Sequence, residues 1–124
     1  MTDITGFGLI GHAREMALAS NVALRLFSKE IAVLPGALEC IRAGYIPGGL
    51  NNNREFAECV VDYEAGVSDE LKALLFDPQT AGGLLVSIAE NDCQKLVAEL
   101  QRAGVSARRI GDVIEAQKPL IRVL

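Results

Sequence analysis

The residue types that could bind a phosphorylated ligand cluster at the start of the chain. Asp3 precedes Thr5, Gly6 and Gly8, and an amphipathic segment follows. A helix that begins here would present free backbone N–H groups and the positive end of its dipole. The two glycines would let a ligand approach that backbone closely, which is typical of a phosphate site. A cation such as Mg²⁺ would have to lie between Asp3 and the phosphates, because the carboxylate alone would repel them.

The same residues have a simpler interpretation, which the sequence leaves open. Asp3 or Thr5 could cap the helix through its side chain, and Gly6 and Gly8 could serve close packing. A GxG pattern alone does not separate the two hypotheses. The segment therefore predicts either part of a phosphate and metal site or an ordinary helix start.

Two further segments could line the same site. Thr80, Gly82 and Gly83 lie just before a strongly apolar stretch, and such loops often border a ligand crevice. They could donate to a phosphate, but the glycines could equally relieve crowding in a tight turn. Residues 46–53 are expected to form a loop, which either makes local Asx turns or closes on a substrate through Asn53.

Other reactive side chains lack the partners that catalysis would need. Cys40, Cys59 and Cys93 are widely spaced and form no CxxC pair, so we expect reduced thiols of a cytoplasmic protein. His12 has apolar helical neighbours and is expected to be a hydrogen-bonded structural residue. We therefore assign no catalytic residue to this chain.

The composition predicts a single domain over residues 1–124. Half of the residues are hydrophobic, which is enough for a core without metal or disulfide support. The net charge of −4 disfavours nucleic-acid binding, which needs clustered basic residues, and Arg108-Arg109 is expected to be a solvated strand edge. No apolar run approaches the roughly 18 residues of a membrane span, and no signal peptide is visible.

Hydrophobic periodicity predicts the elements that would position these loops. Helices are expected over residues 6–19, from Pro35 to a left-handed Gly44, after Ser68, and from an Asn91 cap to Gly104. Strands are expected at 22–27, 59–63, 84–88, 110–114 and 120–124. The strand at 84–88 should be central because it is the most apolar, and the last two strands should form a hairpin. The chain is thus α+β, with helices packed on a mixed sheet of about four or five strands.

Together the motifs resemble those of one family, the selenophosphate synthetases (selenide, water dikinases). The carboxy-terminal domain of that family opens with T-D-(I/V)-T-G-F-G-L-x-G-H, which matches residues 2–12. Its further motifs L-P-G, P-G-G-x-x-x-N, D-P-Q-T-(S/A)-G-G-L-L and I-G-(D/E)-V match residues 34–36, 47–53, 77–85 and 110–113. The resemblance covers essentially the whole chain, and its first and fourth motifs together are highly specific.

The resemblance implies a fold like the carboxy-terminal domain of aminoimidazole ribonucleotide synthetase. It also implies that residues 1–124 are the carboxy-terminal domain of a longer two-domain enzyme. In that family the full enzyme uses ATP as substrate and Mg²⁺ as cofactor to convert selenide, ATP and water to selenophosphate, AMP and orthophosphate. Selenophosphate is the selenium donor for selenocysteine synthesis.

The resemblance further implies which parts of the active site this chain would lack. The missing amino-terminal domain would supply a reactive Cys (or selenocysteine), a Lys, most of the metal-binding acids and the homodimer interface. Asp3 would be the metal ligand contributed from the carboxy-terminal side. The isolated fragment is therefore expected to be inactive.

Two alternatives remain open at this point. The chain could belong to another ATP-using enzyme that shares the fold, such as aminoimidazole ribonucleotide synthetase, thiamine monophosphate kinase or a hydrogenase-maturation protein. These relatives carry different residues at the motif positions, and substrate dependence would separate them. The chain could also be a free-standing, non-catalytic interaction module.

Overall fold

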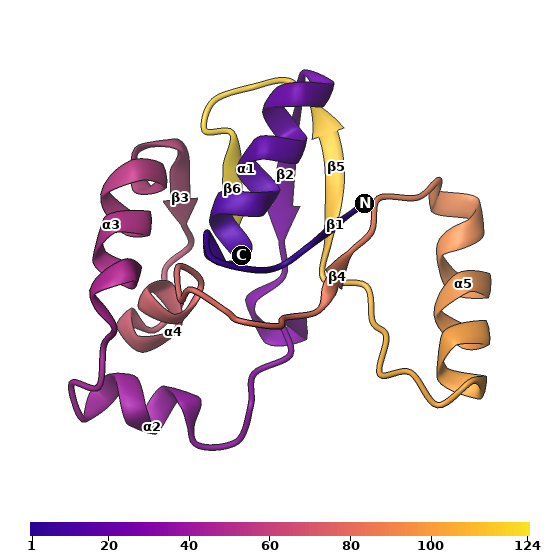
Figure 1. The fold of residues 1–124 in the computed structure, drawn as a ribbon. Helices are drawn as coiled ribbons and strands as arrows, with labels where there is room; N and C mark the ends of the chain where they lie inside the picture. Colours follow the sequence, from indigo (N-terminus) through magenta and orange to yellow (C-terminus); the bar gives the residue numbers. More distant parts are fainter.

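The computed structural model describes all 124 residues and has an α+β architecture (Figure 1). A mixed four-stranded sheet has the order β3-β6-β2-β5. Its strands are β2 (Val22–Leu26), β3 (Val61–Tyr63), β5 (Gly111–Glu115) and β6 (Ile121–Val123). A second, two-stranded sheet pairs β1 (Thr2–Asp3) with β4 (Leu84–Leu85). The predicted fold class is confirmed.

Five α-helices accompany these sheets. They are α1 (Gly8–Ser20), α2 (Ala37–Arg42), α3 (Gly48–Ala57), α4 (Asp69–Leu74) and α5 (Glu90–Arg102). Short 3₁₀ turns occupy Ser28–Glu30 and Glu58–Val60. In Figure 1, α1 lies across the larger sheet, α3 and α4 lie beside β3, and α5 stands on the opposite side. None of the helices combines the length and the apolar character that crossing a membrane requires.

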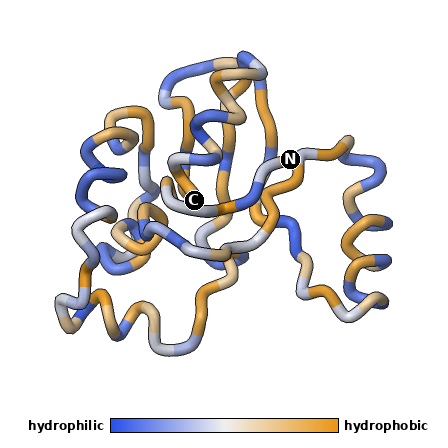
Figure 2. Tube along the Cα trace, viewed as in Figure 1, coloured by the Kyte–Doolittle hydropathy of each residue, from blue (hydrophilic) through white to orange (hydrophobic).

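The core lies between α1 and the larger sheet. Ile121 and Val123 alternate with an exposed arginine on β6, so both face the same side of the sheet, and both are fully buried. Figure 2 shows that the strands behind α1 are largely hydrophobic. Side chains from α1, α3 and the segment after α4 complete the same cluster, among them Ile10, Leu50 and Phe76.

The helix ends that depend on local signals are confirmed. Asn21 ends α1 in a left-handed conformation with φ of 51°, and Gly44 and Gly104 follow α2 and α5 with φ of 83° and 80°. The Ser68 hydroxyl accepts the Leu71 N–H at 3.2 Å and caps α4. Each of these ends is determined by residues within one turn of it, which the sequence shows directly.

The predicted loop over residues 46–53 is wrong, because most of it belongs to α3. Leu50 and Ala57 lie seven residues apart on one face of this helix and are 1% and 0% exposed. An ion pair between Arg54 and Glu58, with an N–O distance of 2.7 Å, supports the end of the helix. Burial of this face outweighs the low helix propensity of glycine and asparagine.

Two predictions about strand neighbours are also wrong. β5 and β6 do not form a hairpin, because β2 lies between them, antiparallel to β5 and parallel to β6. The apolar stretch 84–88 is not a central strand: only β4 within it is paired, and Leu84 is 68% exposed. Strand order depends on pairing between distant segments, which local hydrophobicity does not reveal.

The predicted starts of α1 and α5 are each shifted by two residues. α1 begins at Gly8 after Phe7, and Thr5 does not cap it. α5 begins after Ala89 rather than after Asn91, again without a side-chain cap. The exact first residue of a helix is a weak inference from sequence, because neighbouring starts differ little in energy.

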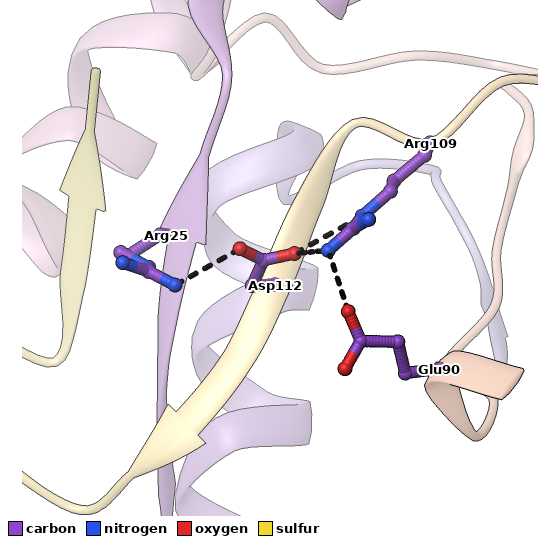
Figure 3. Close-up of polar contacts among 4 residues, drawn as sticks. All are labelled: Arg25, Glu90, Arg109 and Asp112. Atoms are coloured by element: carbon purple, nitrogen blue, oxygen red, sulfur yellow. Dashed lines mark hydrogen bonds and ion pairs between the residues drawn. The ribbon is translucent and has the colours of Figure 1, made fainter. Parts of the chain in front are cut away.

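α5 is the least integrated element of the fold. None of its residues is buried, whereas α1, of equal length, buries six. A polar network links its first residue to the sheet (Figure 3): Glu90 lies 3.7 Å from Arg109, and Arg109 and Arg25 both bond Asp112 on β5. Exposed ion pairs of this kind contribute little stability, so α5 is held mainly by chain connectivity.

We therefore expect the amide protons of α5 to exchange faster than those of α1 in the 124-residue chain. Both helices have 13 residues, but α5 can open without exposing core residues. Hydrogen exchange followed by mass spectrometry would measure the two helices side by side. Equal protection would show that α5 packs against the sheet in solution.

Candidate functional site

Backbone hydrogen bonds join the opening segment to the loop before β4. The N–H of Ile4 donates to the Gly83 carbonyl at 2.8 Å, and the Ile4 carbonyl accepts from the Gly82 N–H at 3.0 Å. These bonds extend the short antiparallel pair in which Asp3 lies opposite Leu84. Two of the three sequence motifs, far apart along the chain, thus form one continuous surface.

Thr5 is held from several sides. Its carbonyl accepts from the N–H groups of Gln79 at 3.0 Å and Gly8 at 3.1 Å. Its own N–H donates to Nε2 of His12 at 3.1 Å, and its Oγ1 lies 3.1 Å from the same nitrogen. Because Nε2 accepts a backbone N–H, the neutral ring carries its proton on Nδ1. His12 is therefore the hydrogen-bonded structural residue that the sequence predicts.

The third motif contributes Asn53, which contacts both of the other segments. Its Nδ2 donates to the Gly6 carbonyl at 2.8 Å and to the Phe76 carbonyl at 3.0 Å. Phe56 lies on the same helix three residues later, and its ring stacks on that of Phe7 with centroids 6.3 Å apart. α3 therefore contacts the opening segment at Gly6 and Phe7, where the sequence had left open a loop with local Asx turns or a loop that closes on a substrate.

The four glycines of the site differ in the space around them. A Cβ on Gly8, whose φ is 69°, would lie 2.7 Å from the backbone that follows α4. A Cβ on Gly82 would collide with the carbonyl oxygen of Ile4. These two glycines are required for close backbone packing. A Cβ on Gly6 or Gly83 would meet no protein atom within 4 Å, so these positions face open space.

Several exposed residues of this surface have backbone N–H groups that donate to no protein atom. Those of Gly6 and Phe7 lie directly before α1, and those of Thr80, Ala81 and Gly83 lie in the loop before β4. Exposed donors beside the start of a helix can bind an anion. The arrangement therefore offers unbonded N–H donors from both motifs at the junction between them.

Asp3 is the carboxylate that the sequence selects for a metal. It is exposed, and its side chain forms no hydrogen bond or ion pair within the chain. No group of three or more His, Cys, Asp or Glu side chains in the chain could hold a metal ion. Asp3 fits the role of a single ligand, and a metal here would need further oxygens from phosphates, water or another polypeptide.

Asp77 is a second carboxylate of this region, which sequence reasoning did not select. It follows directly after Phe76, and its carbonyl oxygen is one of the atoms on which Gly8 packs. Its side chain is partly buried, and this burial raises the pKa of its carboxyl above the usual value. Only the folded environment reveals this feature, since the D-P-Q-T motif reads as a turn.

The main surface hollows lie away from this junction. One of about 520 Å³ lies between the end of α1 and the turn at 116–120, and another of about 700 Å³ lies along α5. Cys59 borders the first and Cys93 the second, and all three cysteines are unpaired. Neither hollow contains a residue of the candidate site.

Comparison with known proteins places the motifs in a family context. The model of the family described as AIR synthase related protein, C-terminal domain, matches residues 1–123. The chain is similar to a selenide, water dikinase of Pelobacter propionicus, with 45% identity over 99% of this chain and 35% of that relative. Selenide, water dikinases of Clostridium botulinum (strain Eklund 17B / Type B) and Clostridioides difficile are 40% and 38% identical over 97% and 100% of this chain. The chain spans about a third of the length of these curated relatives.

The space around the glycines predicts a large loss of stability for one substitution and a small change for another. Gly8→Ala should lower the free energy of unfolding by about 2–4 kcal/mol, because it combines a left-handed φ with a backbone clash. Gly6→Ala should change it by less than about 1 kcal/mol. Urea unfolding of the two variants measures the difference, and similar losses would contradict this account of the junction.

The raised pKa of Asp77 predicts a pH-dependent gain for Asp77→Asn. An acid whose folded pKa is raised destabilises the fold as pH rises through the interval between its unfolded and folded pKa values. Asp77→Asn removes this cost, so its Tm should exceed the wild-type Tm at pH 7. The gain should vanish at pH 3, where the carboxyl is protonated in both states. A lower Tm for the variant at pH 7 would mean that the carboxylate has a stabilising partner.

Proposed function

We propose, from the premise that this chain belongs to the AIR synthase related protein family as its C-terminal domain, that it is part of an ATP-dependent selenophosphate synthetase. The full enzyme would convert selenide, ATP and water to selenophosphate, AMP and orthophosphate. The relatives support this choice, because each is named selenide, water dikinase. The remaining length of those relatives leaves room for an amino-terminal domain, which would complete the site and form a homodimer.

One observation carries the proposal: Asp3 lies three and four residues before Gly6 and Phe7, two exposed residues whose N–H groups bond no protein atom. A carboxylate beside hydrogen-bond donors does not favour the binding of a bare anion, which the carboxylate repels, or of a cation alone, which leaves the donors unused. It suits a phosphate that arrives with a metal ion, since the metal bonds the carboxylate and the N–H groups bond the phosphate oxygens. ATP with Mg²⁺ is such a ligand.

The candidate residues would then have different roles in binding Mg²⁺–ATP. Bound Mg²⁺ would neutralise phosphate charge during phosphoryl transfer, and Asp3 would hold it from this side. The exposed N–H groups of Gly6, Thr80 and Gly83 would bind phosphate oxygens. Their fixed positions would remove the cost of reorganising donors when the ligand binds.

The other glycines and Thr5 would act through shape and position. The N–H groups of Gly8 and Gly82 are already bonded within the protein, so both residues would serve by letting backbones approach. Thr5 faces His12 and would keep the opening segment in place. The chain supplies no nucleophile or general base in this proposal, and the fragment alone would be inactive.

Replacing Asp3 tests the proposal in the full-length protein. We expect Asp3→Asn to lower selenide-dependent ATP consumption on the order of 100-fold, because the metal loses a charged ligand. The Tm should not change, since the Asp3 side chain is exposed and bonds nothing. Asp92→Asn, which removes an exposed carboxylate on α5, is the matched control and should retain full activity. Near-normal activity of Asp3→Asn would exclude Asp3 as a ligand.

The same assay separates the alternatives. ATP consumption that requires thiamine phosphate or formylglycinamidine ribonucleotide instead of selenide would identify a different enzyme of this fold. A full-length protein that consumes no ATP with any of these substrates would favour a non-catalytic interaction module.

A further inference from the structure

We propose that Asn53 is a positioning residue that directs the backbone N–H of Phe7 toward the phosphate group of the ligand. The inference rests on the proposed function, because it assigns a new role within the same surface. Asn53 itself would not touch the ligand. It would act through the peptide group that joins Gly6 to Phe7, and neither that N–H nor this role follows from the sequence motif.

The geometry of the peptide bond carries the first step. The Gly6–Phe7 peptide is trans, and the C=O and N–H of a trans peptide point in opposite directions. Asn53 holds the Gly6 carbonyl at 2.8 Å, so the Phe7 N–H points away from α3. That N–H bonds no protein atom, and Phe7 is exposed. The result is a fixed donor that faces outward beside Gly6.

The second contact of Asn53 anchors the arrangement to the core. Both amide hydrogens of Asn53 are used, one on Gly6 and one on the Phe76 carbonyl at 3.0 Å. Phe76 is fully buried, and its neighbour Leu75 accepts the Ile10 N–H at 3.1 Å. The side-chain amide cannot rotate without losing one of these bonds. It therefore links the opening segment to the core at a defined position.

The ring of Phe7 is contacted by a side chain of the same helix, α3. Phe56 stacks on Phe7, and the guanidinium of Arg14 lies 4.4 Å from the Phe56 ring centroid. Asn53 therefore bonds the peptide group before Phe7, and Phe56 contacts its ring. These two contacts from α3, one to the Gly6 carbonyl and one to the Phe7 ring, restrict the orientation of the Phe7 N–H.

The neighbouring asparagines provide an internal comparison. Asn51 and Asn52 precede Asn53 on α3, but both are exposed and neither forms a side-chain hydrogen bond. The three are the same residue type in one run, and the structure shows that only Asn53 bonds the opening segment. Asn52→Ala is therefore a control that alters the same helix without touching the peptide of Phe7.

Steady-state kinetics of the full-length protein test the role. We expect Asn53→Ala to raise the KM for ATP about tenfold or more, because a donor to a charged phosphate loses its orientation. The kcat at saturating ATP should stay within about threefold, since the binding loss is overcome by ligand. Asn52→Ala should match the wild type. If Asn53 only stabilises the fold, Asn53→Ala will lower the amount of active enzyme and leave KM unchanged, which would overturn the proposal.

A second experiment separates failure of this inference from failure of the proposed function. The full-length protein labelled with ¹⁵N-phenylalanine would be titrated with Mg²⁺–ATP without selenide, and the Phe7 amide resonance followed by NMR. A shift in the wild type and in Asn52→Ala that is lost in Asn53→Ala supports the inference. A shift retained in Asn53→Ala overturns the role of Asn53 while leaving ATP binding intact. No shift in the wild type would count against both the phosphate site and the role of Phe7.

Discussion

The close approach of Gly8 to the backbone after α4 is the constraint on which the rest of the junction depends. Gly8 packs on the carbonyl groups of residues 75–77 with φ of 69°, a position that a side chain would block. Two residues later, the Ile10 N–H donates to the Leu75 carbonyl at 3.1 Å. The start of α1 is thereby fixed against the segment that buries Phe76, and the opening residues must follow the loop before β4.

This constraint determines which polar groups of the opening segment face outward. The carbonyls of Ile4, Thr5 and Gly6 all accept hydrogen bonds from the protein, from the loop before β4 and from Asn53. The N–H groups of Gly6 and Phe7 are left without protein acceptors. The acceptors of this segment are bonded within the protein and its free donors are not, so its backbone can offer hydrogen bonds to an anion, whereas the carboxylate of Asp3 opposes one unless a cation lies between them.

The sequence was sufficient where a structure is determined by neighbours along the chain. The Ser68 cap, the left-handed Gly44, the end of α5 at Gly104 and the bonded His12 were all predicted. It failed where distant segments decide, as in the position of β2 between β5 and β6 and in the exposed Leu84. The helix over Gly48–Ala57 belongs to the second class, because the burial of Leu50 stabilises a segment of low helix propensity.

The same division applies to the candidate site. Residue type and spacing were enough to select its motif residues as candidates. Two further groups of the same region, the Phe7 N–H and Asp77, were not selected, for physical reasons. The Phe7 N–H is a backbone group, so no residue type marks it, and its availability follows from bonds that the neighbouring carbonyls make. Asp77 is distinguished by burial, which raises its pKa and depends on the packing around it.

The exposed position of Asp3 has a consequence for how a divided site can fold. Several carboxylates gathered around a metal repel one another until the metal is bound, and each raises the cost of folding without it. No group of three or more such side chains lies in this chain, and Asp3 is exposed and forms no ion pair. Its carboxylate therefore costs the isolated fold little. If the other ligands lie in a separate domain, as proposed, each domain can fold first, and the repulsion arises only when ligand, metal and both surfaces meet.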